Sequence, residues 1–217
     1  MSGRQDGAWA SGKQNASCSL YRRLLGPAWV QLPAAVAEMH DVADTGERVA
    51  RGWVDVERGR GALARLAATL AGFPDAADAG EIEVRFEARD GIEIWTRRFG
   101  DKVFRSRQSA SRGRNADLLA EDLGPFRILM SLAVEDGRLK LAVRGWQLLG
   151  LPLPLALAPG GEVYEEERDG RFHFHVEVMA PLIGPIVRYT GWLVPVETPD
   201  SVQLPAMPSS SESSALR

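Results

Sequence analysis

The stretch EIEVRFEARDGIEIWTRRFGDKVFRSRQS, residues 81–109, decides the fold of this chain. Apolar and charged residues alternate along its first part, which is the pattern of a β-strand with one buried face. The pairs Asp90-Gly91 and Gly100-Asp101 then divide the stretch into three extended runs. Such a pair between extended runs is typical of a β-hairpin, because a type I′ turn needs positive φ at both central residues. The stretch therefore predicts three consecutive antiparallel strands.

The hairpin pattern continues along the chain, where Asp136-Gly137 and Asp169-Gly170 mark two more turns. The whole sequence predicts nine strands, at residues 46–57, 81–89, 92–99, 102–109, 126–135, 138–147, 162–168, 171–179 and 185–195. A sheet of this size in hairpin order tends to coil or close, because closure removes its exposed edges.

The helical part of the sequence is small. Residues 19–26 and 32–40 predict two short helices, and residues 59–74 predict the main one. The apolar stripe of this main helix consists of Leu63, Leu66, Ala67 and Leu70. We therefore expect an α+β fold that is mostly antiparallel β, a strongly curved sheet or partial barrel of about nine strands with the helices covering one face or mouth. That architecture often encloses a ligand cavity.

The two ends of the chain differ in composition from the middle. Residues 1–18 lack periodicity and residues 197–217 are rich in Pro and Ser, so both are predicted to be disordered tails. Residues 19–196 contain no internal repeat or linker, and we expect them to form a single β-rich domain. The one cysteine, Cys18, falls in the N-terminal tail, so no internal disulfide is possible.

Charge and hydropathy narrow the class of protein. The net charge of −3 gives no general reason to expect nucleic-acid binding, and the basic segment 97–114 lacks aromatic residues at a stacking spacing. The N-terminus has no apolar run typical of a signal peptide. The most apolar segment, 146–161, is shorter than a spanning helix needs and is interrupted by prolines. We expect a cytoplasmic protein without membrane insertion, in which this segment is a core-covering loop or a lid over a cavity.

Two-residue turns at 90–91 and 100–101 fix which side chains share a face of the sheet. They place Trp95 between Phe86 and Ser106, and Arg97 between Val84 and Phe104. Glu93 and Phe99 belong to the same face by alternation.

A guanidinium among apolar side chains must be paired or must bind an anionic ligand. Two interpretations of Arg97 therefore stay open. Either Arg97 forms an internal ion pair with Glu93 or Glu121 that only fixes the structure, or it anchors a ligand.

A two-residue turn at 136–137 places Leu132 opposite Leu141 on the core face of the next hairpin. The other face then carries Leu129 opposite Arg144 and Arg127 opposite Trp146. Arg144 and Trp146 either line the mouth of a cavity or form a solvated face on which the arginine stacks on the indole.

The stretch GRFHFHVEV, residues 170–178, places His173 and His175 on one face of a strand. A three-residue turn at 168–170 would set Glu165 opposite His173, and Tyr164 opposite Phe174. A zinc site needs three or four converging ligands, and three alternating residues on a flat strand converge poorly. We therefore predict a polar outer face and no metal site.

Several segments resemble, in the same order, the bacterial family called domain of unknown function 4166. They are YRRLLGPAWVQLP, GWVDVERG, EIWTRRFGDKVFRS, LAEDLGPFR, GWQLLGLPLPLALAP, GRFHFHVEV and PLIGPIVRYTGWL. The resemblance covers about residues 20–195, and Glu121, His40, Arg188, Tyr189 and Trp192 also lie in family-like segments. Some relatives carry this domain behind a domain resembling saccharopine dehydrogenase, which implies a dehydrogenase-like partner as one possibility. The resemblance implies no established activity and no cofactor.

These observations predict a domain that binds a small molecule in an apolar cavity, with Arg97 fixing an anionic or carbonyl group. The residues predicted to bind the ligand are Trp95, Arg97, Phe99, Phe104, Ser106, Arg144, Trp146 and Tyr189. One alternative is a metal-independent isomerase or cyclase that uses Glu93 or Glu121 as an acid or base. Another is an interaction module whose loop 148–160 docks on a dehydrogenase-like protein.

Overall fold

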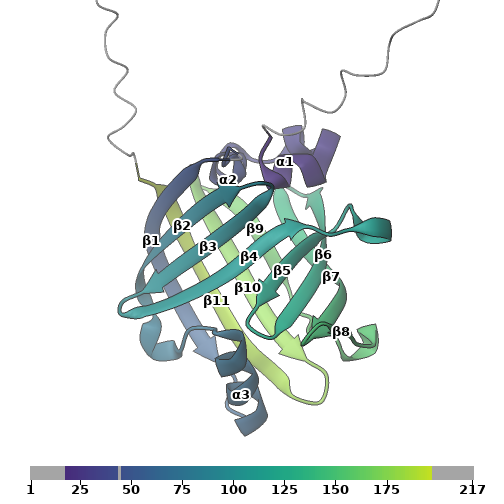
Figure 1. The fold of residues 1–217 in the computed structure, drawn as a ribbon. Coiled ribbons are helices and arrows are strands. Elements are labelled where there is room, and N and C mark those ends of the chain that lie inside the picture. The colour runs from purple at the N-terminus through teal and green to yellow at the C-terminus, as the bar shows by residue number, and fades with distance from the viewer. Residues whose placement is uncertain (1–17, 44, 197–217) are drawn as a thin grey trace, which may run out of the picture.

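The computed structural model describes residues 18–43 and 45–196 (Figure 1). These residues form a mostly antiparallel β-barrel with short helices at its ends. The disordered tails predicted at 1–18 and 197–217 lie outside the described residues, except for Cys18 at the boundary.

The helices are α1 (Leu20–Leu25), α2 (Ala34–His40) and α3 (Ala62–Ala71), and the 3₁₀ turns are η1 (Gly26–Gln31), η2 (Ala76–Asp78), η3 (Gly113–Asn115) and η4 (Leu155–Leu157). The strands are β1 (Glu47–Arg58), β2 (Gly80–Arg89), β3 (Ile92–Phe99), β4 (Lys102–Ala110), β5 (Leu119–Leu123), β6 (Phe126–Glu135), β7 (Arg138–Leu148), β8 (Leu151–Pro152), β9 (Val163–Arg168), β10 (Arg171–Ala180) and β11 (Gly184–Pro195).

The sheet closes on itself. Its strand order is β6-β5-β4-β3-β2-β1-β11-β10-β9-β7-β8, and an additional pairing of β6 with β7 completes a ring that leaves out only β8 among the described strands. The coarse class was therefore predicted correctly, but the barrel is complete rather than partial. The prediction missed β5, which is short, and β8, a two-residue edge strand that ends at Pro152.

The Asp-Gly turns have the geometry that the sequence predicts. Asp90, Asp136 and Asp169 have φ of 50–52°, and the glycine after each also has positive φ. The registers around β3 are confirmed, because Trp95 lies opposite Phe86 and Ser106. Arg97 correspondingly lies between β2 and β4, on the inner face of the barrel.

The predicted register of β6 and β7 is wrong beyond a β-bulge. The pairs near the turn, such as Leu132 with Leu141, are confirmed, but the register shifts between Leu129 and Met130. Leu129 therefore lies opposite Gly145 and not opposite Arg144, and Ile128 lies opposite Trp146. The extra residue in β7 moves every side chain beyond it to the other face, which is why Trp146 points inward.

The turn between β9 and β10 also differs from the prediction. It has two residues, Asp169 and Gly170, because Arg168 pairs with Arg171. Glu165 therefore lies opposite Phe174 and Glu166 lies opposite His173, one residue out of the predicted register. A one-residue change exchanges the two faces of a strand, so Glu165 belongs to the interior.

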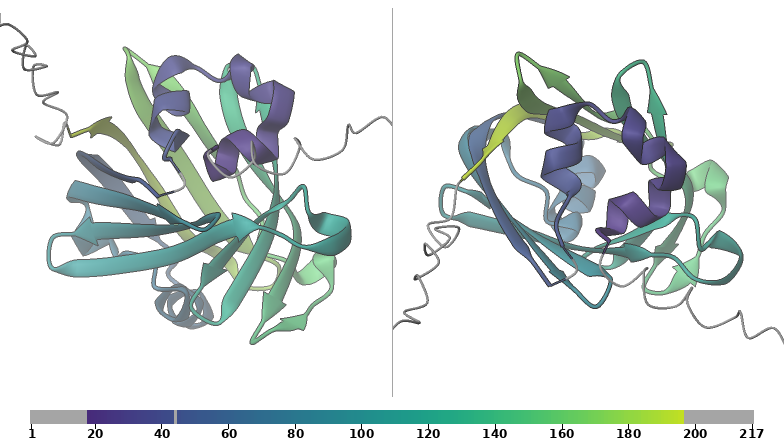
Figure 2. Two further views of the ribbon diagram at one scale, coloured as in Figure 1. Left: turned by 45° about the horizontal axis from the view of Figure 1, so that its top comes forward. Right: turned by 90° about the horizontal axis from the view of Figure 1, so that it is seen from above.

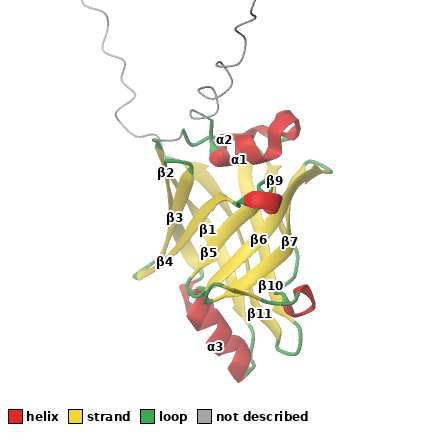
Figure 3. Ribbon diagram, turned by 45° about the vertical axis from the view of Figure 1, so that its right-hand side comes forward, coloured by secondary structure: helices red, strands yellow, loops and turns green. Residues whose placement is uncertain are grey.

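The two ends of the barrel are covered differently. Seen along the barrel axis, α1 and α2 lie across one mouth (Figure 2, right), where Tyr21 and His40 are fully buried. The third helix, α3, lies at the opposite end (Figure 3). Its buried residues are alanines, Ala64, Ala68 and Ala71, whereas the leucines of its predicted apolar stripe are exposed.

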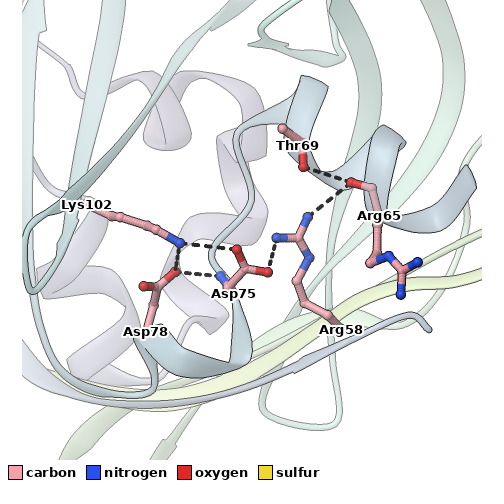
Figure 4. A network of polar contacts seen from close by, with 6 residues as sticks. All are labelled: Arg58, Arg65, Thr69, Asp75, Asp78 and Lys102. Carbon is pink, nitrogen blue, oxygen red and sulfur yellow. Dashed lines mark hydrogen bonds and ion pairs between the residues drawn. The ribbon is translucent and has the colours of Figure 1, made fainter. Parts of the chain in front are cut away.

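A network of polar contacts fastens α3 and η2 to the barrel wall (Figure 4). The carboxylate of Asp75 accepts hydrogen bonds from Arg58 of β1 and from Lys102 of β4, the latter at 3.1 Å. Arg58 also donates to the carbonyl of Arg65 in α3, and Lys102 donates to Asp78 at 2.9 Å. The hydrogen bond from Lys102, together with Arg58, holds the pKa of Asp75 below its usual value.

We predict that Asp75→Asn lowers the free energy of unfolding at neutral pH by about 0.5 kcal/mol, because these contacts are largely exposed to solvent. A lowered pKa stabilises the folded state above the unfolded value of about 4, and that stabilisation disappears as the pH falls through the folded pKa. Urea unfolding of both proteins checks this. If the difference in free energy of unfolding between the two proteins stays constant down to about pH 3, the lowered pKa of Asp75 is contradicted.

Candidate functional site

The barrel encloses a cavity of about 550 Å³. Tyr21 of α1 lines it at the capped end, whereas Leu63 of α3 and Leu182 of the β10–β11 turn line it at the other end. The walls between these ends are mostly apolar, with side chains such as Phe104, Ile128, Met130, Leu141, Trp146 and Val176. The cavity volume lies within the range of small-molecule sites, which is about 300–1,000 Å³.

Most of the polar groups in the cavity lining lie beneath α1 and α2, and Glu177 of β10 lies apart from them. We call the set Tyr21, Arg97, Gln108, Glu121, Glu165 and Tyr189 the polar end of the cavity. The hydroxyl of Tyr21 donates to Gln108 Oε1 at 3.0 Å, and Gln108 Nε2 donates to Glu121 Oε1 at 3.2 Å. This chain of hydrogen bonds links the capping helix α1 to the interior faces of β4 and β5.

Arg97 lies at the centre of the polar end. Its guanidinium carbon is 4.9 Å from the ring centre of Trp95 and 5.1 Å from that of Phe104, so the group is held between two aromatic side chains. Its Nη1 donates to Ser106 Oγ at 2.9 Å. Its Nη2 forms an ion pair with Glu121 Oε1 at 3.8 Å, as one of the two interpretations predicted, but this distance is beyond a hydrogen bond. Hydrogen bonds to the described residues therefore occupy only one of its five N–H donors.

A second pair of polar groups joins α2 to the barrel. His40, fully buried at the end of α2, forms a hydrogen bond through Nε2 with Glu165 of β9. The imidazole ring stacks on Tyr21 with ring centres 3.8 Å apart, and it lies 5.5 Å from the ring of Trp95. Glu165 therefore bonds to a residue of the cap and also lines the cavity.

Glu93 is buried outside the cavity lining. It accepts hydrogen bonds from the backbone N–H of Leu20 at 3.3 Å and from Trp95 Nε1 at 3.1 Å. Burial raises the pKa of Glu93, although these hydrogen bonds oppose that shift. Burial also raises the pKa of Tyr189 to about 12 and that of Tyr21 well above its usual value. Both tyrosines are therefore neutral hydroxyl groups at physiological pH.

The structure brings together most of the predicted site residues. Those that line the cavity are Trp95, Arg97, Phe104, Glu121, Trp146 and Tyr189. Ser106 lies behind the lining and supports Arg97, and Phe99 is buried in the core. Arg144 is exposed on the outer face and donates to Ser131 Oγ at 2.9 Å, so it does not line the cavity. Of the two acid candidates, Glu121 faces the cavity and Glu93 does not.

Sequence reasoning missed three residues of the polar end. Gln108 is the next inward position after Phe104 and Ser106 in β4, so the alternation could have identified it. Glu165 could have been found by giving Asp169-Gly170 the two-residue turn used for the other Asp-Gly pairs. Nothing in the sequence could place Tyr21 over the barrel mouth, because that contact joins α1 to β4 across the fold.

The histidines of β10 lie apart from this site. His175 stacks on Tyr164 of the neighbouring strand with ring centres 4.9 Å apart, and His173 lies opposite Glu166. Burial lowers the pKa of His173. Within the described ranges, no three His, Cys, Asp or Glu side chains are grouped closely enough to hold a metal ion. No described helix is both long and apolar enough to cross a membrane.

The fold and the site define a closed antiparallel β-barrel with an internal cavity that is polar at one end and apolar along its walls. The chain belongs to the family described as domain of unknown function (DUF4166), whose model matches residues 32–193. Searches of curated proteins and of solved structures found no match.

We predict that Glu93→Gln changes the pH dependence of stability. Because the folded pKa of Glu93 is raised, the folded state retains a proton after the unfolded chain has lost it. This contribution to stability is present at low pH and is lost as the pH rises from about 4.3 through the folded pKa. Relative to the variant, the wild-type protein should therefore be more favoured at about pH 5 than at about pH 7. Denaturant unfolding at both pH values checks this, and parallel stability profiles would contradict it.

Proposed function

We propose that this barrel binds an elongated, mostly apolar small molecule that carries an anionic or carbonyl group. The observation that carries the proposal is Arg97, whose guanidinium faces an apolar cavity with most of its donors uncommitted. Such a group is costly to bury unless a partner accepts its hydrogen bonds. Glu121, at 3.8 Å, provides a nearby charge but no hydrogen bond, so a ligand oxygen is the group that completes the site.

The cavity sets the orientation of the ligand. Most of its polar groups lie under α1 and α2, while the walls toward α3 are mostly apolar. The oxygen-bearing group therefore lies at Arg97, and the apolar part extends past Trp146 toward Leu182. Burial of that apolar part supplies most of the binding free energy, at about 25 cal/mol per Å². The hydrogen bonds at Arg97 supply specificity for the group at the end.

The charge balance at the polar end determines how strongly the site prefers an anion over a carbonyl. Arg97 attracts an anion, whereas the carboxylate of Glu121 on the same cavity opposes it. The phenol of Tyr189 adds a neutral donor because burial raises its pKa to about 12. The site as built accepts either group, and the pairing with Glu121 moderates its preference for anions.

We predict that Arg97→Gln weakens binding of a long-chain carboxylate probe, dansyl-undecanoate, by about tenfold or more, because the charged donor at the buried end is lost. Titration monitored by dansyl fluorescence measures this. Arg98→Gln is the matched control, because Arg98 neighbours Arg97 on the same strand but is exposed. Equal affinity in wild-type protein and the Arg97 variant, with both folded by circular dichroism, would contradict the role of Arg97.

Glu121→Gln should strengthen the binding of the same probe. The substitution removes a carboxylate next to Arg97 but keeps an oxygen that can accept from Gln108. We expect about a threefold to tenfold gain in affinity for dansyl-undecanoate, since a like charge near the bound carboxylate disappears. The affinity for an uncharged analogue, dansyl-undecanol, should change little. A loss of affinity for both probes would show that Glu121 only supports the fold.

A second candidate function is acid–base catalysis on the bound molecule. The two carboxylates of the polar end, Glu121 and Glu165, line the same cavity as Arg97, and Glu165 is hydrogen-bonded to His40. Such groups can move a proton at a position next to a polarised carbonyl. To test this, a molecule that copurifies with the protein is returned to wild-type and Glu121→Gln protein and followed by mass spectrometry and NMR. Chemical change with wild-type protein alone supports catalysis, and no change favours binding.

A further inference from the structure

Exposed leucines surround the end of the barrel opposite the cap. We call Leu63, Leu66, Leu70, Leu149, Leu155 and Leu182 the leucine collar. They come from α3, from the segment between β7 and β9, and from the β10–β11 turn, and all three elements meet at the same end of the barrel (Figures 1 and 3). Their exposed fractions range from 51% for Leu70 to 97% for Leu182.

The collar is continuous with the cavity. Leu63 and Leu182 are both highly exposed and both line the cavity, so they form part of its rim. Single exposed leucines are normal on a soluble protein, but a cluster of them around one opening marks a surface that meets an apolar partner. The capping helices α1 and α2 lie at the other end of the barrel (Figure 2), and each leucine of the collar is more than half exposed.

The segments that carry the collar contain few charges, and the acidic residues that follow α3, Asp75 and Asp78, are paired with Arg58 and Lys102. Segments 145–161 and 178–187 contain no charged residue, and segment 59–74 contains only Arg60 and Arg65. Both arginines are exposed, and neither guanidinium forms an ion pair with a described carboxylate. Apolar side chains on protruding elements with unpaired arginines beside them complement a bilayer surface that carries anionic headgroups.

We propose that the leucine collar docks this protein on an anionic membrane surface. The leucines enter the headgroup region, and Arg60 and Arg65 contact the lipid phosphates. The opening rimmed by Leu63 and Leu182 then faces the bilayer, so an apolar molecule can pass between membrane and cavity without crossing water. This inference goes beyond ligand binding and does not depend on which molecule the cavity holds.

The experiment is sedimentation of the full chain with vesicles. We expect binding to phosphatidylcholine vesicles that contain about one third phosphatidylglycerol, and weaker binding to pure phosphatidylcholine or at high salt. The double variant L66E/L70E should reduce binding to the anionic vesicles by about tenfold or more. Both side chains are more than half exposed and neither lines the cavity, so neither the fold nor the ligand site depends on them.

Two further variants separate the contributions. Val30→Glu is the matched control, because Val30 is 84% exposed but belongs to η1 beside the cap. It should bind vesicles as the wild-type protein does. The variant R60Q/R65Q should lose the preference for anionic vesicles and keep the weaker binding to neutral ones, because it leaves the leucines in place.

Three results would overturn the proposal. They are wild-type protein that stays in the supernatant with anionic vesicles, equal loss of binding in Val30→Glu, and a collar-dependent dimer or protein complex without vesicle binding. Membrane docking and ligand binding can be contradicted independently of each other. L66E/L70E should bind dansyl-undecanoate normally in detergent-free solution, and Arg97→Gln should still sediment with vesicles.

Discussion

Closure of the barrel turns alternate side chains of its strands into one shared interior, and every charge placed there needs a partner. The interior holds Arg97, Glu121 and Glu165 together with Gln108, and the buried Glu93 lies beside them. The helices that cross one mouth supply several of the partners. Tyr21 is hydrogen-bonded to Gln108, His40 to Glu165, and the backbone N–H of Leu20 to Glu93. The polar interior therefore both fixes the cap and leaves Arg97 with donors directed at the cavity.

This arrangement gives the barrel two unlike ends. The polar groups and their partners close the capped end, whereas the end at α3 has apolar walls and exposed leucines. Ligand orientation and docking surface both follow from this asymmetry. An amphiphilic molecule places its oxygen-bearing group where the donors are and its apolar part where they are absent. The network around Asp75 serves a different purpose, since it fastens α3 beside the opening.

Local rules predicted much of the barrel from the sequence. The Asp-Gly and Gly-Asp turns determined the registers of β2, β3 and β4, and hence the inward position of Arg97. The predictions failed where one residue changes the face of a strand. The bulge opposite Leu129 falls at Arg144 and Gly145, where a single glycine in the strand is the local signal, and it turns Trp146 inward and leaves Arg144 outside. The contribution of α1 and α2 to the site depends on contacts between distant segments, which no pattern along the chain reveals.

The most direct test of the central claim is a crystal structure of the protein with a saturating long-chain carboxylate such as dodecanoate. The account predicts one molecule inside the barrel, with its carboxylate within hydrogen-bond distance of the Arg97 guanidinium and its chain extending past Trp146 toward Leu182. A carboxylate at the α3 end, or a barrel interior that stays free of ligand while Arg97 forms hydrogen bonds with Glu121, would contradict it.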